Sequence, residues 1–473
     1  MKESINPTRN KRVTVMGLGL FGGGVGISRW LHKSGAKITI TDLRNPTELK
    51  ESLQALSNLK GITYHLGKHW AKDFTKTDLV VVNPAIPPNS PYLALAKKNH
   101  IPLETESNLF FQLCPAPIIG ITGSNGKTTT AYLIAEMLKG TKRKIWLGGN
   151  IGKKSLVEKV HQIKKDDIVI LELSSFQLED LNHIKKSPYV SVITNISPNH
   201  LDRHKTMSNY IQAKKAIIRH QGKSDYVILN LDDREVRQWS RESRGKILYF
   251  SHHKHSYNGT FIHDNKIYVS SNGYKRIICD ISDTRLPGNF NQGNIVAALT
   301  VAEIFNIPTS HLAGVIKTFS GVEHRLEFAL NVNGVKYYND SIATNPVSTI
   351  GAINAISGNL HIILGGYDKQ LPFDELAKVI IRNYKRIKST ILIGATADKI
   401  ESALLKANNK NQIQNHTIIL KSLSLEQSVA LASHLATSGD TVLLSPACAS
   451  FDMFRNFAER GALFKKIVKT LLK

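Results

Sequence analysis

A glycine-rich turn between an apolar run and a helix-forming segment constrains this chain most. The turn contains Thr122-Gly-Ser-Asn-Gly-Lys-Thr128. In such a turn, backbone N–H groups point at phosphate oxygens, Lys127 neutralises charge and Thr128 can reach a metal. Gly120 lies six residues before Gly126, one more than in the strict GxxxxGK[ST] pattern. An ordinary strand-to-helix connection is the alternative, but the preceding apolar strand favours use of a nucleoside triphosphate.

Length and composition predict a globular protein of several domains. The chain has 473 residues, 41% of them hydrophobic and 21% charged, and about three domains are expected. No apolar run approaches the ~18 residues of a membrane span and the first residues are polar, so neither export nor membrane insertion is expected. The cytoplasm is the predicted compartment. Three scattered cysteines, Cys114, Cys279 and Cys448, indicate reduced thiols and argue against a zinc site.

The net charge of +25 allows two kinds of partner. A nucleic-acid-binding ATPase is one explanation. However, the basic residues are spread along the chain, which favours a polyanionic small substrate drawn to a positive protein. Many of these lysines are equally explained as solvated surface residues.

Short apolar runs alternate with helical stretches throughout, which predicts parallel sheets covered by helices. The expected domains are 1–115, 116–321 and 322–473. A hairpin is expected around 252–274, and a basic amphipathic helix from about Ala462 to the end. The expected strands lie at 13–16, 38–40, 79–82, 168–171, 189–193, 226–229, 360–364, 390–393 and 441–444.

The first domain carries a second phosphate-binding pattern. Gly17, Gly19 and Gly22 follow a strand, and Asp42 lies 20 residues after Gly22, as in a dinucleotide fingerprint. Alone, this pattern would indicate an NAD-dependent oxidoreductase. A UDP-sugar also offers a pyrophosphate, and the second loop at Lys127 decides against hydride transfer.

Polar residues follow two further strands of the central domain. Glu172 ends an apolar strand, and a segment at 195–204 that includes His200 follows another. Parallel strands end at one sheet edge, so a carboxylate there, beside the phosphate loop, is expected to bind magnesium. The sequence thus predicts a nucleotide and metal site at this edge.

Seven ordered segments resemble the Mur ligases over essentially the full length of the chain. The segments are Thr122–Thr128, Gly148–Gly152, Glu172–Leu178, Asn199–His204, Gly321–Glu327, Asn339–Asn345 and Ser445–Asp452. The last two are most similar to the family members that add D-glutamate.

The resemblance implies an α/β fold of three domains: a Rossmann-like UDP-binding domain, a central P-loop ATPase-like domain with a parallel sheet, and a Rossmann-like C-terminal domain for the amino acid. It implies an ADP-forming ligase in which the carboxylate of UDP-N-acetylmuramoyl-L-alanine attacks the γ-phosphate of ATP. Glutamate then displaces phosphate from the acyl phosphate. The expected ligands are ATP, Mg²⁺ at two sites and these two substrates. The protein is expected to be a monomer without nucleic-acid or membrane partners.

The resemblance also assigns site residues. ATP would contact Gly123, Ser124, Asn125, Gly126, Lys127, Thr128, Thr129, Asn291, Asn294, Arg325 and Asp340. The UDP substrate would contact Gly19, Leu20, Asp42, Arg44, Asn150, Ser174 and His200, and glutamate would contact Thr344, Lys369, Ser450 and Phe457. Metal ligands would be Thr128, Glu172, His200 and Lys214 as a carbamate, and catalysis would depend on Lys127, Glu172, His200 and Lys214.

Three positions need comment. On residue type alone Lys214 is expected to be a surface lysine like its neighbour Lys215, and only the resemblance makes it a carbamylated ligand. Phe290 stands where many relatives have histidine. Ile342 replaces the usual lysine of the Asn339–Asn345 segment, so a ligase adding L-glutamate or another amino acid stays open. A UDP-sugar-binding regulator without turnover is a further alternative.

Overall fold

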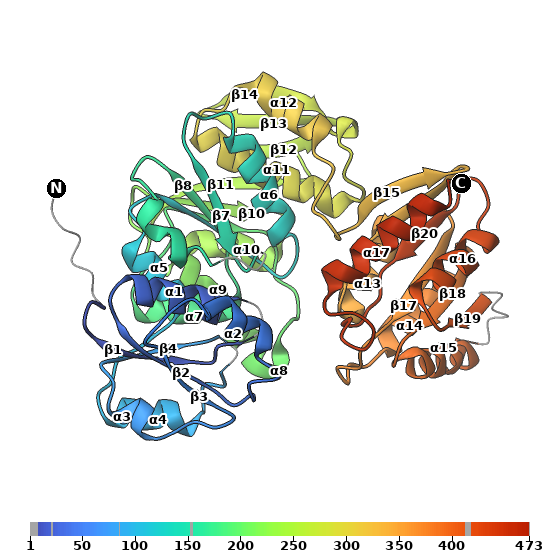
Figure 1. Ribbon diagram of the computed structural model, residues 1–473. Helices are drawn as coiled ribbons and strands as arrows, with labels where there is room; N and C mark the ends of the chain where they lie inside the picture. The colour runs from blue at the N-terminus through green and yellow to red at the C-terminus, as the bar shows by residue number, and fades with distance from the viewer. Residues whose placement is uncertain (1–7, 20–21, 85, 152–154, 412–417, 473) are drawn as a thin grey trace. The chain divides into compact units, whose positions relative to one another are not determined.

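The computed structural model describes residues 8–19, 22–84, 86–151, 155–411 and 418–472. Leu20, one of the expected UDP-substrate contacts, lies outside these ranges. The chain forms two compact units, Met1–Ser282 with Gly293–Val315, and Asp283–Gln292 with Ile316–Lys473. Three sheets, two in the first unit and one in the second, carry the fold (Figure 1).

The first sheet is wholly parallel, in the order β3-β2-β1-β4-β5. Helices α1 and α2 lie on one side of it, and α3 and α4 on the other (Figure 1). Its elements are β1 (Arg12–Met16), α1 (Gly23–Lys33), β2 (Lys37–Asp42), α2 (Lys50–Leu56), β3 (Thr63–Leu66), α3 (Lys72–Thr75), β4 (Leu79–Val82), α4 (Pro91–Lys98), β5 (Leu103–Glu104) and α5 (Glu106–Leu113).

The central sheet has nine strands in the order β14-β13-β12-β11-β10-β9-β6-β8-β7. It is parallel from β7 to β12, and β12 to β14 form an antiparallel edge. The predicted hairpin is therefore confirmed as β12 and β13. The strands are β6 (Ile118–Thr122), β7 (Ile145–Gly149), β8 (Ile168–Glu172), β9 (Val190–Ile193), β10 (Tyr226–Asn230), β11 (Lys246–Ser251), β12 (Gly259–His263), β13 (Lys266–Ser271) and β14 (Tyr274–Asp280).

Helices lie between these strands in the sequence or, for the last two, after β14. They are α6 (Lys127–Leu138), α7 (Ser175–His183), α8 (Leu201–His204), α9 (Met207–Arg219), α10 (Arg234–Gln238), α11 (Asn289–Ile304) and α12 (Thr309–Thr318), with short 3₁₀ turns η1 (Val157–Gln162), η2 (Trp239–Arg241) and η3 (Ile281–Asp283). The strand β6 is buried along its whole length between β8 and β9. Its apolar run is thus a central strand, and the turn that follows it begins at the carboxyl edge of the sheet.

The third sheet has the order β15-β16-β20-β17-β18-β19 and is parallel except for β15. Helices α13 to α15 bury apolar side chains on one face, and α16 and α17 on the other. The elements are β15 (Glu327–Val332), β16 (Val335–Asn339), α13 (Pro346–Ala355), β17 (Leu360–Gly365), α14 (Asp374–Arg382), β18 (Ile387–Ile393), α15 (Ala397–Asn411), β19 (Ile418–Ser422), α16 (Leu425–Leu435), β20 (Thr441–Leu444) and α17 (Phe457–Thr470).

The last helix begins before the predicted Ala462. Asn456 lies at its N-cap and accepts a hydrogen bond from the backbone N–H of Glu459, so the helix starts at Phe457. The prediction was wrong because it followed the basic residues and overlooked the cap.

The described residues contain neither a membrane-spanning helix nor a disulfide bond. None of its helices combines the length and the apolar character that a bilayer crossing requires. The three cysteines all lie within the described ranges, and none of them forms a disulfide.

Candidate nucleotide and metal site

The phosphate loop depends on two glycines with positive φ, Gly123 at 145° and Gly126 at 82°. At Gly126 a side chain is also sterically excluded, because a Cβ would lie 2.2 Å from Oδ1 of Asn294. Gly126 is the N-cap of α6, so the loop delivers the chain directly into a helix N-terminus. Backbone N–H groups at such a position attract phosphate oxygens.

Lys127 lies over this loop. Its Nζ donates to the carbonyl oxygens of Gly123 at 2.9 Å and Ser124 at 3.0 Å. Carbonyl acceptors hold the ammonium without cancelling its charge. The loop is further fixed from the neighbouring strand, since Asn125 donates its backbone N–H to Oδ1 of Asn195 at 2.9 Å. A cation and oriented N–H groups are therefore held at one edge of the sheet.

A carboxylate meets the loop at its other side. Thr128 donates its hydroxyl to Oε2 of Glu172 at 2.6 Å, and Asn150 donates its amide to Oε1 at 3.3 Å. Glu172 is 4% exposed. Gly149, with φ of 83°, makes this approach possible, because a Cβ there would lie 2.2 Å from the carbonyl oxygen of Glu172. Hydroxyl and carboxylate oxygens are hard ligands of the kind Mg²⁺ prefers.

Lys214 is a buried lysine, contrary to the expectation from residue type. It is 2% exposed, and its Nζ donates to Oγ1 of Thr122 at 3.2 Å and to the carbonyl oxygen of Gly123 at 3.0 Å. Burial, and secondarily the charge of Lys127, lowers its pKa well below the ordinary value, although Glu172 opposes the shift.

The spacing along α9 could have revealed this burial. Lys214 follows buried Tyr210 by four residues and precedes buried Ile217 by three, so it lies on the apolar face of the helix. By contrast, Lys215 points its ammonium at Glu242, 2.6 Å from Oε1.

His200 occupies a left-handed conformation, φ 54°, just before α8. The residue is exposed, and its ring packs against Phe176 with centroids 5.2 Å apart. Its neighbour His204, to which the sequence assigned no role, is buried and shares a 2.9 Å hydrogen bond with the hydroxyl of Ser175. This bond attaches α8 to α7.

In the first domain, Asp42 organises the glycine-rich turn. Its carboxylate accepts the backbone N–H of Gly19 at 3.1 Å and that of Arg44 at 2.9 Å, and the Arg44 guanidinium lies 3.4 Å away. Ser174, the remaining expected contact of the UDP substrate, is the N-cap of α7 in a capping box with Gln177.

The remaining ATP-site candidates divide between the two units. In the first unit, Asn294 is buried and accepts the Thr130 hydroxyl at 3.3 Å, and Thr129 is buried in α6. In the second unit, Asn291 is buried and donates to the carbonyl oxygen of Pro287 at 2.7 Å.

Asp340 is a buried acid of the second unit. Its carboxylate accepts from the backbone N–H of Leu326 at 3.1 Å and from the Ser445 hydroxyl at 2.7 Å. Burial raises its pKa to about 6, although these hydrogen bonds and the charge of Arg325 oppose the shift.

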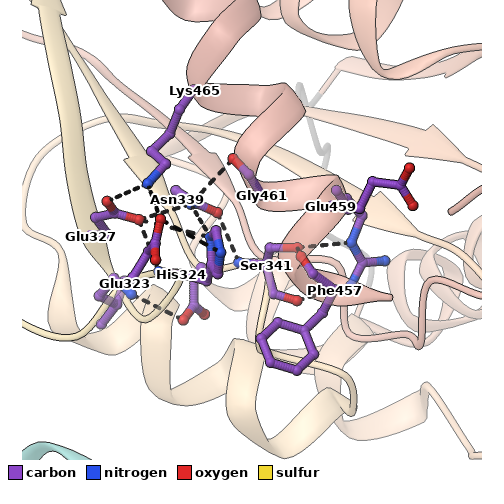
Figure 2. Close-up of polar contacts among 12 residues, drawn as sticks. Glu323, His324, Glu327, Asn339, Ser341, Phe457, Glu459, Gly461 and Lys465 are labelled. Carbon is purple, nitrogen blue, oxygen red and sulfur yellow. Dashed lines mark hydrogen bonds and ion pairs between the residues drawn. The ribbon is translucent and has the colours of Figure 1, made fainter. Parts of the chain in front are cut away.

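The candidate glutamate contacts all belong to the second compact unit. Thr344 lies before α13, Ser450 is buried after β20, and Phe457 opens α17, whereas Lys369 is exposed after β17. Figure 2 shows Phe457 beside Ser341, and next to them the cluster in which Asn339 meets His324. At the edge of this cluster, the Lys465 ammonium forms ion pairs with Glu323 and Glu327.

A phosphate loop with a basic residue, an adjacent buried carboxylate and parallel strands defines a nucleotide-binding α/β protein. Comparison with family models specifies the class further. The MurD-like N-terminal domain of Mur ligases matches residues 11–104, the Mur ligase middle domain matches 121–302, and the Mur ligase glutamate ligase domain matches 324–448. The chain belongs to the Mur ligase family. Mur ligases use ATP and Mg²⁺.

Curated relatives match nearly the whole chain. The UDP-N-acetylmuramoylalanine–D-glutamate ligases of Acetivibrio thermocellus and Roseiflexus sp. are each 41% identical, covering 98% and 97% of this chain and 97% and 98% of their own lengths. Solved structures share the fold at low identity. One is the UDP-N-acetylmuramate-alanine ligase MurC of Thermotoga maritima, with a TM-score of 0.60 and 17% identity, covering 98% of this chain and 100% of that one. Another is the MurF ligase of the same organism in complex with ADP, with a TM-score of 0.58 and 16% identity, covering 99% of this chain and 100% of that one.

Proposed function

We propose that this protein is the ATP-dependent ligase that joins D-glutamate to UDP-N-acetylmuramoyl-L-alanine and releases ADP and phosphate. The reaction belongs to peptidoglycan precursor synthesis. The full-length likeness to D-glutamate ligases supports the choice of substrates. The observation that carries the chemistry is the arrangement at the phosphate loop, where Lys127 lies over the loop and Thr128 bonds Glu172.

The loop would serve phosphoryl transfer. Lys127 and the N–H groups at the start of α6 would hold the β- and γ-phosphates of ATP. The alanyl carboxylate of the UDP substrate then attacks the γ-phosphorus, ADP leaves, and an acyl phosphate remains. The glutamate amine attacks the acyl carbon, and phosphate leaves as the amide forms. Positive charge at the loop reduces the repulsion between two anionic reactants.

Thr128 and Glu172 fit a magnesium site, since a hydroxyl and a carboxylate oxygen already lie 2.6 Å apart beside the loop. When bound there, Mg²⁺ would neutralise charge on the phosphates. Among the described residues no three His, Cys, Asp or Glu side chains gather as a metal cluster. For a second magnesium site we propose an additional anion.

Lys214 is our candidate for that anion. Its depressed pKa favours the neutral amine, which adds to CO₂ and gives up a proton to become a carbamate. The carbamate would bring negative charge beside Thr122 and Gly123, where the amine now donates. His200 would be its partner ligand.

The other two substrates would use the first and third domains. Asp42 joins the loop of Gly19 to that of Arg44 by accepting both backbone N–H groups, and these residues would receive the uridine end of the UDP substrate. Asn150 and Ser174 would lie near its peptide end. Thr344, Lys369, Ser450 and Phe457 would receive glutamate. Because Ile342 replaces the lysine usual in this segment, no cation is available at that position to bind the amino acid. The choice between D-glutamate and other amino acids is therefore tested directly.

The decisive assay measures phosphate release with UDP-N-acetylmuramoyl-L-alanine, ATP and each glutamate enantiomer. Turnover with D-glutamate and not with L-glutamate supports the proposal. Preference for L-glutamate or another amino acid would reassign the enzyme within its family. No phosphate release with any amino acid would remove the ligase assignment.

A further inference from the structure

Arg460 is a buried cation in the first turn of α17, only 2% exposed. Its guanidinium reaches two loops. Nε donates to the Ser341 hydroxyl at 3.0 Å and Nη2 to the Ser341 carbonyl oxygen at 2.9 Å. From the other loop, the carbonyl oxygens of Cys448 and Ala449 accept at 3.1 Å and 3.3 Å. Burial lowers the pKa of Arg460 to about 10, so the guanidinium remains protonated at neutral pH.

Both loops lead into residues proposed to receive glutamate. Ser341 lies three residues before Thr344, and Ala449 immediately precedes Ser450. The Ser341 hydroxyl also donates to the carbonyl oxygen of Phe457 at 2.7 Å, as Figure 2 shows. One guanidinium therefore ties together the loops that carry Thr344 and Ser450.

We propose that Arg460 is a positioning residue that sets the distance between the two loops of the amino-acid site. This inference rests on the proposed function. All four of these hydrogen bonds end on neutral protein acceptors, so Arg460 acts through the loops and not by touching the substrate. A lysine presents a point charge without the planar fork and cannot make this set of bonds.

The test separates the two halves of the reaction. Without amino acid, hydroxylamine traps the acyl phosphate as a hydroxamate, which reports the ATP-dependent step alone. We expect Arg460→Lys to raise KM for D-glutamate about tenfold or more while hydroxamate formation and KM for ATP stay within about twofold. Arg460→Ala should behave similarly, and added guanidinium ion should lower its KM for D-glutamate. Lys466→Ala, at an exposed position of the same helix, should match wild type in every assay.

Ser341→Ala provides a milder second variant in case the arginine variants do not fold. It removes one contact to Arg460 and the bond to Phe457, and should raise KM for D-glutamate about two- to fivefold. An unchanged KM in a folded variant, or a parallel fall in hydroxamate formation, would overturn the positioning role. If the wild-type enzyme releases no phosphate with D-glutamate, the proposed function fails as well. If only the variants are unaffected, the role of Arg460 alone fails.

Discussion

Thr128 lies in α6, the helix that follows β6, and donates its hydroxyl at 2.6 Å to the carboxylate of Glu172, the last residue of the adjacent strand β8. The bond holds two oxygen atoms of the kind that Mg²⁺ prefers side by side at the phosphate loop. Each residue thereby holds the other in place before any ion binds.

This pairing predicts how the enzyme depends on magnesium. Thr128→Val keeps the shape but removes the hydroxyl, and should raise the Mg²⁺ concentration needed for half-maximal activity about tenfold or more. Thr128→Ser, the matched control, retains the hydroxyl and should stay near wild type. Equal Mg²⁺ dependence of all three proteins would exclude Thr128 as a ligand.

Lys127→Ala should abolish product formation without unfolding the protein. The lysine loses two hydrogen bonds to carbonyl groups, a cost of about 0.5–1.5 kcal/mol each, whereas the loss of charge at the phosphates is far larger for catalysis. Calorimetry and phosphate release measure the two effects. Lys139→Ala, at the exposed end of the same helix, should change neither. A large fall in Tm for Lys127→Ala would contradict this separation.

Lys214→Ala should lose most activity, and short carboxylic acids should restore part of it by standing in for the carbamate. Because the Lys214 side chain is buried, its truncation to alanine would leave room for a small acid. Lys215→Ala, whose ammonium pairs with Glu242 at the surface, serves as the control and should need no rescue. If acetate or formate restores nothing to a folded Lys214→Ala protein, the carbamate role is wrong.

Gly126→Ala should destabilise the protein more than Gly273→Ala. Both glycines have nearly the same φ, 82° and 85°, so both substitutions incur the left-handed penalty of about 1–2 kcal/mol. A Cβ at Gly126 would also collide with Asn294, whereas nothing lies within 4 Å of one at Gly273. We expect an additional cost of about 1–3 kcal/mol at Gly126 as the Thr130–Asn294 bond breaks. Equal denaturation midpoints would show that Asn294 moves freely.

Asp340 should make stability fall as pH rises. Its folded pKa, about 6, exceeds the ordinary 3.8, so the folded state retains a proton that the unfolded state loses. The contribution of Asp340 to the free energy of unfolding is therefore full below pH 3.8 and is lost as pH rises through 6. The loss is on the order of 3 kcal/mol. Asp340→Asn keeps an acceptor for Leu326 and a partner for Ser445 without a charge. Its Tm, relative to wild type, should increase between pH 4 and 7; a constant difference would contradict the shift.

The sequence predicted the sheets better than it predicted the fate of charged side chains. Apolar runs identified strands such as β4 and β20 with their observed limits, because burial on both faces requires continuous apolar residues. Arg460 and Lys214 were different. Arg460 bonds Ser341 and Lys214 bonds Thr122, partners far away in the sequence. The spacing along α9 indicates that Lys214 is buried, but no local pattern identifies either partner.

The sequence located the loops of the candidate site, but it did not predict the contacts between them. The glycine-rich turn and Glu172 could be located because strand ends share a sheet edge. The approach of Asn150 to Glu172 requires Gly149 to pass against the neighbouring backbone, and only the three-dimensional structure reveals that contact.

The burial of Lys214 has a practical consequence for anyone handling the enzyme. A carbamate on an enclosed amine would exchange with dissolved CO₂ only as the protein opens locally, so the history of a preparation would persist in its specific activity. Batches dialysed in degassed buffer should show low initial activity that recovers after bicarbonate is added. Assays that do not control dissolved CO₂ would therefore give different specific activities for the same protein.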